Sequence, residues 1–420
     1  MRLSVGPTTL FDKSALESLN PDESLWFDNF YNPVITPLFY VETLADLYKE
    51  ECRNRTPEQI VGHLAIKTPE MSATVCVDHW NLRDANLQGC RIEMGRRPHV
   101  RGARRFDVGG QEGAYFEQPD ELLAFKRWQE GDFLGVERDF AKRWRQSLSE
   151  LDLTVAYPIV RQLNGGRTRL SGLAEALEIA ERMVSGNGAR FATLKALFQL
   201  LSVPTELRSP ILKLWKDASG PRLQEFAPYA AYMLKVDFFF YLALDAGLLS
   251  SERVSNRVDM AYLYYLPFCQ VFTSGDKLHR AVAPHFLGED QLFLWAPDFK
   301  ADLKALNDHF SALPDDVKAQ GISKFAKSPP MEGNYLTTRI WDKFSPNWRK
   351  PYTPPSEKMR EKVGGLMQAL SDSKSFKSKL REAGPSSVKS LEELDHLVVQ
   401  RVIHARRGNW QIIPPETGSE

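Results

Sequence analysis

Two short apolar segments, far apart in the chain, are each followed by an aspartate, and this pattern constrains the fold more than any other. Residues 8–11 precede Asp12, and residues 271–275 precede Asp276. Short apolar runs that end at turn-forming residues are typical of strands buried on both faces of a parallel sheet. We therefore expect an α/β core assembled from the N-terminus and a region some 260 residues later.

The segments between and around these strands complete the expected organisation. Residues 33–36 are extended, and Pro37 suits the first turn of a helix over 38–50. A further strand is expected at 291–295. The predicted divisions are 1–50 (first part of the core), 51–229 (a mainly helical insertion), 230–312 (second part of the core) and 313–420 (a Pro-rich extension with helices at 357–370 and 391–401).

Charge and cysteine content exclude several classes of protein. Lys and Arg together number 54, as do Asp and Glu, so bulk charge does not favour coating of nucleic acid or of an anionic membrane. The four cysteines have no metal-ligand spacing and are expected to be reduced thiols of a cytoplasmic protein. Charged residues interrupt the most apolar stretch, 227–249, which predicts a buried helix and no membrane partner.

Four carboxylates are candidates for one acidic site: Asp12, Glu42, Asp259 and Asp276. Asp12 and Asp276 follow predicted strands, and ligands of parallel sheets bind at the carboxyl ends of the strands. Glu42 and Asp259 lie near the starts of two predicted helices. Converging carboxylates repel one another, and a divalent cation relieves this repulsion; oxygen ligands suit Mg²⁺ or Mn²⁺. The alternatives are ordinary roles as helix caps, turn residues or a solvated face.

At these residues the chain resembles the PIN-like nucleases. Residues 10–16, Leu-Phe-Asp-Lys-Ser-Ala-Leu, resemble the opening strand of that family with its catalytic Asp. The second, third and fourth motifs of the family resemble, in order, residues 37–44, 259–262 and 273–277. The resemblance implies a PIN-like Rossmannoid parallel sheet flanked by helices. Because 217 residues separate Glu42 from Asp259, it also implies a large insertion in that sheet.

The resemblance further implies metal-assisted hydrolysis of phosphodiester bonds, with RNA favoured over DNA as substrate. The four acids would be catalytic residues that bind one or two Mg²⁺ or Mn²⁺ ions. Ser14 and Ser274 would orient a ligand carboxylate by hydrogen bonding, and Asp46, one helical turn from Glu42, could be an outer ligand.

A basic stretch is a candidate nucleic-acid-binding segment. Arginine binds phosphate oxygens bidentately, and interleaved Gly and Pro would let the chain follow a backbone. Aromatic residues are sparse there, so stacking on successive bases is not expected. The alternative is a solvated loop whose arginines pair with acids of the same chain. The candidates are Arg91, Arg96, Arg97, Arg101, Arg104 and Arg105.

Two other functions compete with the nuclease. One is a non-catalytic PIN-like binding or scaffold protein, which would act on a protein partner, or as a homo-oligomer, through the insertion and the C-terminal extension. The other is a phosphatase of the haloacid-dehalogenase type, suggested by Phe11-Asp12. It is disfavoured because Ser14 stands where a second Asp is required.

Overall fold

The fold is built on a five-stranded, all-parallel sheet. The computed structural model of the 420-residue chain describes residues 6–49, 54–100, 103–108, 111–116, 119–186, 190–350 and 405–413. The strand order across the sheet is β3-β2-β1-β6-β7. These strands are β1 (Thr8–Phe11), β2 (Asn32–Ile35), β3 (Thr74–Val75), β6 (Val271–Ser274) and β7 (Leu292–Trp295).

The first strand occupies the centre of the sheet. On one side Leu10 of β1 is in register with Val34 of β2, and on the other Phe11 is in register with Thr273 of β6. The chain therefore builds β1, β2 and β3 outward in one direction and returns about two hundred residues later to build β6 and β7 in the other. Such a reversal of strand order opens a crevice at the carboxyl ends of the strands.

Adjacent residues of each strand are buried against different layers, as the two-residue period of a strand requires. Leu10, Val34 and Phe272 pack in one hydrophobic cluster, whereas Phe11 and Ile35 pack in another. Because both faces are covered, the strands are continuous apolar runs rather than alternating ones.

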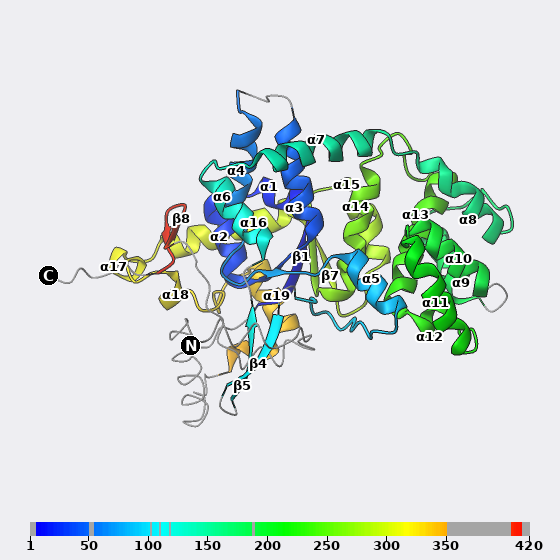
Figure 1. The fold of residues 1–420 in the computed structure, drawn as a ribbon. Helices are drawn as coiled ribbons and strands as arrows, with labels where there is room; N and C mark the ends of the chain where they lie inside the picture. Colours follow the sequence, from blue (N-terminus) through cyan, green and yellow to red (C-terminus); the bar gives the residue numbers. More distant parts are fainter. Residues whose placement is uncertain are drawn as a thin grey trace.

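Helices cover both faces, and Figure 1 shows the two groups on opposite sides of the sheet. One layer contains α1 (Lys13–Ser18), α2 (Pro21–Phe30), α3 (Pro37–Leu44), α4 (Pro57–Lys67), α6 (Asp120–Gln129), α7 (Gly135–Ser149), α16 (Ala296–Ser311) and α19 (Leu336–Phe344). The other contains α5 (His79–Leu87), α8 (Tyr157–Leu163), α9 (Leu173–Ser185), α10 (Arg190–Leu200), α11 (Thr205–Asp217), α12 (Leu223–Phe226), α13 (Pro228–Asp245), α14 (Asn256–Tyr262) and α15 (Lys277–Val282).

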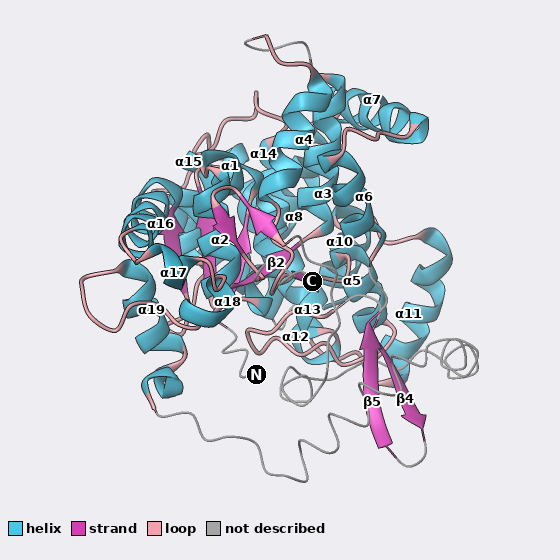
Figure 2. Cartoon of the chain, turned by 90° about the vertical axis from the view of Figure 1, so that its left-hand side faces the viewer, coloured by secondary structure: helices cyan, strands magenta, loops and turns pink. Residues whose placement is uncertain are grey.

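Shorter elements complete the described residues. The hairpin of β4 (Ala103–Val108) and β5 (Gln111–Phe116) extends away from the sheet (Figure 2), and a second hairpin pairs β8 (Arg406–Arg407) with β9 (Trp410–Gln411). The remaining helices are α17 (Asp315–Lys318), α18 (Ile322–Phe325) and the 3₁₀ turns η1 (Ala45–Tyr48), η2 (Leu153–Ala156), η3 (Leu263–Phe268), η4 (Ala283–His285) and η5 (Pro346–Arg349).

The α/β class with a parallel sheet, expected from the sequence, is confirmed. The division at residue 51 does not match the structure, because Thr74–Val75 pairs with β2 as an edge strand of the sheet. Much of the segment 51–229 forms the second helical layer, which contains α5 and α8–α13 and covers one face of the sheet. The segment therefore completes the core that it was expected to interrupt. The helices expected at 357–370 and 391–401 lie outside the described residues.

The apolar stretch 227–249 forms the helix α13, and nearly all of its side chains are buried in the helical layer, as expected. Across the described parts of the chain, we find no helix with the length and apolar character that crossing a membrane requires. Cys76, Cys90 and Cys269 are free thiols.

Candidate functional site

The carboxyl ends of the central strands lead directly into helices, and the residues at these junctions are helix caps. Asp12 caps α1 by accepting the amide of Ala15 at 2.8 Å, and Asp276 caps α15 by accepting the amide of Leu278 at 2.6 Å. The cap role that the sequence left open for Asp12 is therefore realised, and Asp276, for which the alternative was a turn residue, is a helix cap as well. Because β1 and β6 are neighbours, these two acids lie at the same edge of the sheet.

Asp12 is almost completely buried, and donors of the protein surround its carboxylate. Besides Ala15, it accepts hydrogen bonds from Ser14 Oγ at 2.8 Å, Ser274 Oγ at 2.6 Å and His279 Nδ1 at 3.2 Å. Burial raises the pKa of Asp12, but the hydrogen bond and charge of His279, together with the hydrogen bonds from Ser274 and Ala15, lower it overall. The carboxylate is therefore ionised and fully hydrogen-bonded.

His279, on α15, connects two of the predicted acidic residues. Its Nδ1 lies 2.8 Å from Ser274 Oγ and faces Asp12, and its Nε2 lies 2.7 Å from the carbonyl oxygen of Asp259. Burial lowers the pKa of His279, but Asp12 and Asp259 raise it to about 9. At neutral pH the ring is therefore an imidazolium that donates from both nitrogens.

The Ser274–His279–Asp12 contacts are not a nucleophilic triad. Ser274 and His279 are both completely buried, so neither reaches a substrate. Ser274 also accepts the amide of Asp276 at 2.9 Å, and Ser14 Oγ accepts the amide of Gly275 at 2.9 Å. Both serines thus orient the Asp12 carboxylate and the loop after β6.

Glu42, on α3, and Asp259, on α14, both have raised pKa values. Tyr262 donates its hydroxyl to Glu42 Oε2. Burial raises the pKa of Glu42 to about 8, and the charges of Asp259 and Asp12 raise it as well. Burial raises the pKa of Asp259 to about 6, with contributions from Asp276 and Asp12. The four predicted acids therefore lie close enough to repel one another.

The donor chemistry suits a hard divalent cation, but the side chains do not meet at one point. Within the described residues, no three His, Cys, Asp or Glu side chains converge closely enough to hold a metal ion. The oxygens of Asp12 are already used by protein donors. The oxygens of Glu42, Asp259 and Asp276 are less occupied, and burial is the main cause of the raised pKa values of Glu42 and Asp259. These three residues have the atom type that a hard cation prefers, but as they lie they do not form a metal position.

Asp46 is separated from this acidic site by its own partners. It is buried on η1, and its carboxylate forms ion pairs with Lys13, with Lys49 at 2.7 Å and with Arg145 at 3.1 Å. Its charge is therefore compensated by cations, which does not suit the predicted role of outer metal ligand.

The basic stretch is partly used for internal ion pairs, as its alternative interpretation predicted. Arg96 forms a bidentate pair with Asp290, at 2.9 and 3.0 Å, and Arg91 contacts Glu93 at 2.7 Å. Arg97 is partly buried. Arg104 and Arg105 belong to strand β4, and Arg101 lies outside the described residues.

The sequence analysis missed two residues of the site, His279 and Tyr262. The histidines of the chain show no spacing that marks a function, and Tyr262 belongs to an aromatic run that is typical of a core. The positions still hold a signal, because His279 follows the strand-end Asp276 by three residues and Tyr262 follows Asp259 by three. Each lies one helical turn beyond a candidate acid.

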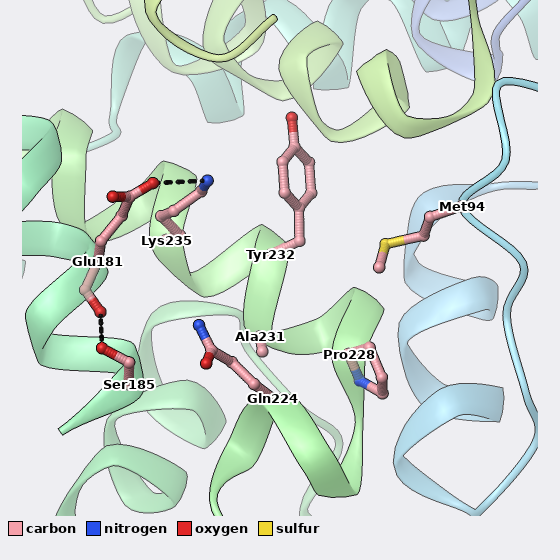
Figure 3. Close-up of a pocket in the computed structure, with 8 residues that line it drawn as sticks. All are labelled: Met94, Glu181, Ser185, Gln224, Pro228, Ala231, Tyr232 and Lys235. Atoms are coloured by element: carbon pink, nitrogen blue, oxygen red, sulfur yellow. Dashed lines mark hydrogen bonds and ion pairs between the residues drawn. The ribbon is translucent and has the colours of Figure 1, made fainter. Parts of the chain in front are cut away.

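A pocket of about 400 Å³ lies elsewhere, between α9, α13 and the loop before β4 (Figure 3). Its lining includes Met94, Tyr232 and Lys235, and none of the four candidate acids. Lys235 points to Glu181 and pairs with it at 3.2 Å, so the charged groups of the pocket compensate each other.

Comparisons with known proteins do not assign the chain to a family. No family model matches it, and no match is found among the curated proteins or among the solved structures. The function must therefore be argued from the site itself.

Proposed function

We propose that this protein is a Mg²⁺- or Mn²⁺-dependent nuclease whose acidic site is formed by Asp12, Glu42, Asp259 and Asp276. The observation that supports the proposal is geometric: Asp12 and Asp276 follow neighbouring parallel strands at the carboxyl edge of the sheet, where the strand order reverses, and contacts through His279 and Tyr262 connect this edge to Asp259 and Glu42. RNA is preferred to DNA as substrate on the resemblance to PIN-like nucleases alone.

Each acid has a distinct part in this proposal. Glu42, Asp259 and Asp276 would hold the metal, which supplies an activated water and stabilises charge on the scissile phosphate. Asp12, fixed by Ser14, Ser274 and His279, would anchor the strand ends beside which these three acids lie. Lys49, which pairs with Asp46 and is the more exposed of its two lysine partners, would be available to contact substrate phosphates.

One observation favours the second candidate, a non-catalytic binding or scaffold protein. The Asp12 carboxylate is satisfied by its own chain, and the described acids do not converge on a metal position. The helical layer that contains α10, α11 and α13 also exposes large apolar side chains, among them Val155, Phe191 and Leu214. In this alternative the acidic network is structural and the helical layer binds a protein partner.

Cleavage of labelled RNA and single-stranded DNA in Mn²⁺ and in Mg²⁺, with EDTA as the metal-free control, separates the two candidates. The informative variants are Glu42→Gln and Asp259→Asn, because among the described residues Glu42 accepts a side-chain hydrogen bond from Tyr262 and the Asp259 carboxylate accepts none, which leaves oxygens of both for a ligand. Asp308→Asn on α16 is a matched control, since Asp308 is exposed and pairs with Lys304 of the same helix at 2.9 Å.

We expect cleavage by the wild type and by the Asp308 variant, and a loss of at least ~100-fold in the Glu42 and Asp259 variants and in EDTA. Cleavage that survives both substitutions would place the active centre elsewhere. Absence of both cleavage and Mn²⁺ binding in the wild type would favour the scaffold protein.

A further inference from the structure

We propose that the cations around the buried Asp46 form a binding site for a backbone phosphate of a single-stranded nucleic acid. Asp46 lies on η1, and its carboxylate pairs with Lys13, Lys49 and Arg145. The proposal rests on the proposed nuclease function, since the ligand is the substrate strand. It deepens that function by stating where the strand is held, and it requires no metal ion.

The Asp46 carboxylate fixes cations that come from three parts of the chain. Lys49 Nζ, just after η1, lies 2.7 Å from Asp46 Oδ1, and Arg145 Nη2 of α7 donates to the same oxygen at 3.1 Å. Lys13, the first residue of α1, contacts Oδ2. These cationic groups are therefore held in place before a ligand arrives, which reduces the entropy lost on binding.

The acids of this cluster do not neutralise its cations. Besides Asp46, Glu17 pairs with Lys13 at 3.4 Å, so within the described residues two carboxylates face three cations. Lys142 adds a further positive charge, because it is exposed and lies one helical turn before Arg145 on the same side of α7. The surface around η1 and α7 therefore favours an anion.

Two of the three cations keep donors for a ligand. The side chains of Lys49 and Arg145 are 42% and 36% exposed, whereas that of Lys13 is 12% exposed. Arg145 directs Nε to the carbonyl oxygen of Ala45, at 3.2 Å, and no described residue accepts from its Nη1. An ammonium group has three N–H donors, so Lys49 keeps two beyond its pair with Asp46. The non-bridging oxygens of a phosphodiester are acceptors for both groups.

A neighbouring aromatic ring favours a nucleic-acid strand over other anions. Tyr48, the last residue of η1, directly precedes Lys49 and is 54% exposed. Proteins bind single strands with this combination, in which cations hold the phosphates and aromatic rings stack on the bases. A lipid headgroup or free phosphate offers the ring no base to stack on.

The position of the cluster beside the acidic site fits a continuous strand. Asp46 follows Glu42 by about one helical turn, and Lys13 directly follows Asp12. Helix α7 packs against both η1 and α3, and Figure 1 shows it above α1 and α3. A strand held by this cluster therefore passes beside Glu42.

Binding of a labelled single-stranded RNA of about 12 nucleotides, and of DNA of the same sequence, tests the site. Fluorescence anisotropy is measured on the full-length chain in EDTA, so that metal-dependent cleavage does not interfere. The variants are the double substitution Lys49→Gln with Lys142→Gln, which removes two exposed cations, and Tyr48→Ala. Lys213→Gln is the control, since Lys213 is exposed on α11 in the other helical layer.

We expect the double variant to bind about 10-fold more weakly. Its slope of log Kd against log salt should fall by about 1 to 1.5, because each phosphate contact with a single strand contributes about 0.7. Tyr48→Ala should bind about 10-fold more weakly with an unchanged slope, since stacking releases no counterions. The Lys213 variant should equal the wild type. If thermal unfolding shows that the double variant is unstable, Lys142→Gln alone leaves the Asp46 pairs intact and should lower the slope by about 0.7.

The other outcomes separate this site from the nuclease activity. A double variant that binds within twofold of the wild type, with an unchanged salt slope, would overturn the site and leave the nuclease proposal standing. A wild type that binds phosphatidylserine vesicles or inorganic phosphate through these lysines, but neither oligonucleotide, would overturn the nucleic-acid ligand. Oligonucleotide binding that depends on these lysines, without cleavage in Mn²⁺ or Mg²⁺, would support the site and refute the nuclease.

Discussion

At the scale of single residues, the property that distinguishes the four acids is how many of their oxygens the protein already uses. Asp12 has donors on both oxygens and a lowered pKa, whereas Asp259 accepts no hydrogen bond from a described residue on its carboxylate and has a pKa of about 6. Asp12 and Asp259 thus carry the same carboxyl group at the same sheet edge, but the pKa of Asp12 is lowered and that of Asp259 is raised. A cation would gain most from the unsatisfied oxygens of Glu42 and Asp259.

Tyr262→Phe should make the carboxylate of Glu42 harder to ionise. The tyrosine hydroxyl is a hydrogen-bond donor to the charged form, so it lowers a pKa that burial raises to about 8. We expect the pKa of Glu42 to rise by about 1 unit, equivalent to ~1.4 kcal/mol, measured by carbon-13 NMR titration of the carboxyl group. Tyr241→Phe serves as the control, and an unchanged Glu42 would contradict the contact.

Single residues were also where the sequence was least informative. The strand-end acids Asp12 and Asp276 are visible because each follows an apolar run. The contact of His279 with Asp12 joins residues 267 positions apart, and no local pattern encodes it. The same holds for Tyr262 and Glu42, which are 220 positions apart. Local patterns locate the candidates, and only the folded chain reveals which side chains support them.

At the scale of elements, α14 is the helix on which the acidic site depends most. It carries Asp259 and is anchored to α13 by a buried ion pair between Arg257 and Asp237, at 3.1 Å. Tyr264 joins this pair by donating to Asp237 and by accepting from Arg257 at 2.8 Å. Through this ion pair, α13 helps to hold α14, and with it Asp259, in position.

Asp237→Ala should destabilise this anchor strongly. It leaves the Arg257 guanidinium without its counter-charge in the interior, and breaking such a pair costs ~3–5 kcal/mol. Urea unfolding should show this loss, and Asp237→Leu combined with Arg257→Met should recover part of it. A single variant as stable as the wild type would mean that the pair contributes nothing to holding α14.

Elements with a strong local pattern were predicted from the sequence, and weak ones were not. The strands β1, β2, β6 and β7 and the helices α3 and α13 lie where apolar runs, a helix-starting proline or a long apolar stretch indicate them. The edge strand β3 was missed because it has two residues, Thr74 and Val75, which are too few to show the pattern of a strand although apolar residues flank them. Its pairing depends on β2, a neighbour in space, and not on its own composition.

At the scale of the whole molecule, the buried titratable groups make stability and metal binding depend on pH. His279, Glu42 and Asp259 have folded-state pKa values of about 9, 8 and 6, each above the ordinary value. A raised folded pKa favours the folded state at pH below the ordinary value, and this contribution is lost as pH rises through the folded pKa. Metal-free protein should therefore lose stability steadily between about pH 5 and pH 9.

Divalent cations should reverse this trend, because they replace the proton on Glu42 and Asp259. We expect Mn²⁺ to bind more tightly from pH 6 to pH 8 and to release about one proton at pH 7, which calorimetry in buffers of different ionisation enthalpy would measure. In Glu42→Gln both the proton release and the pH dependence should be smaller. Mn²⁺ affinity that is constant over this range would contradict a site made of these acids.

The last described residues, 405–413, contact two helices of the core. The hairpin 405–413 packs on α2, where the buried Arg407 forms ion pairs with Asp28 and Glu70, both at 3.2 Å. Trp410 donates to Asn307 of α16 at 2.8 Å. The hairpin thus joins a helix from the first part of the core to a helix from the second.

Arg407→Ala tests whether this junction stabilises the fold. Asp28 would lose its buried counter-charge but keep hydrogen bonds from the backbone amides of residues 70–72, so we expect a loss near ~3 kcal/mol in urea unfolding. Arg406→Ala, at the exposed neighbouring position, should change stability by less than ~0.5 kcal/mol. Equal stability of the two variants would mean that the ion pairs of the hairpin contribute nothing to the free energy of unfolding. A large loss in Arg407→Ala alone would make residues 405–413 a third piece of the core, beside the two that the strand-end aspartates indicate.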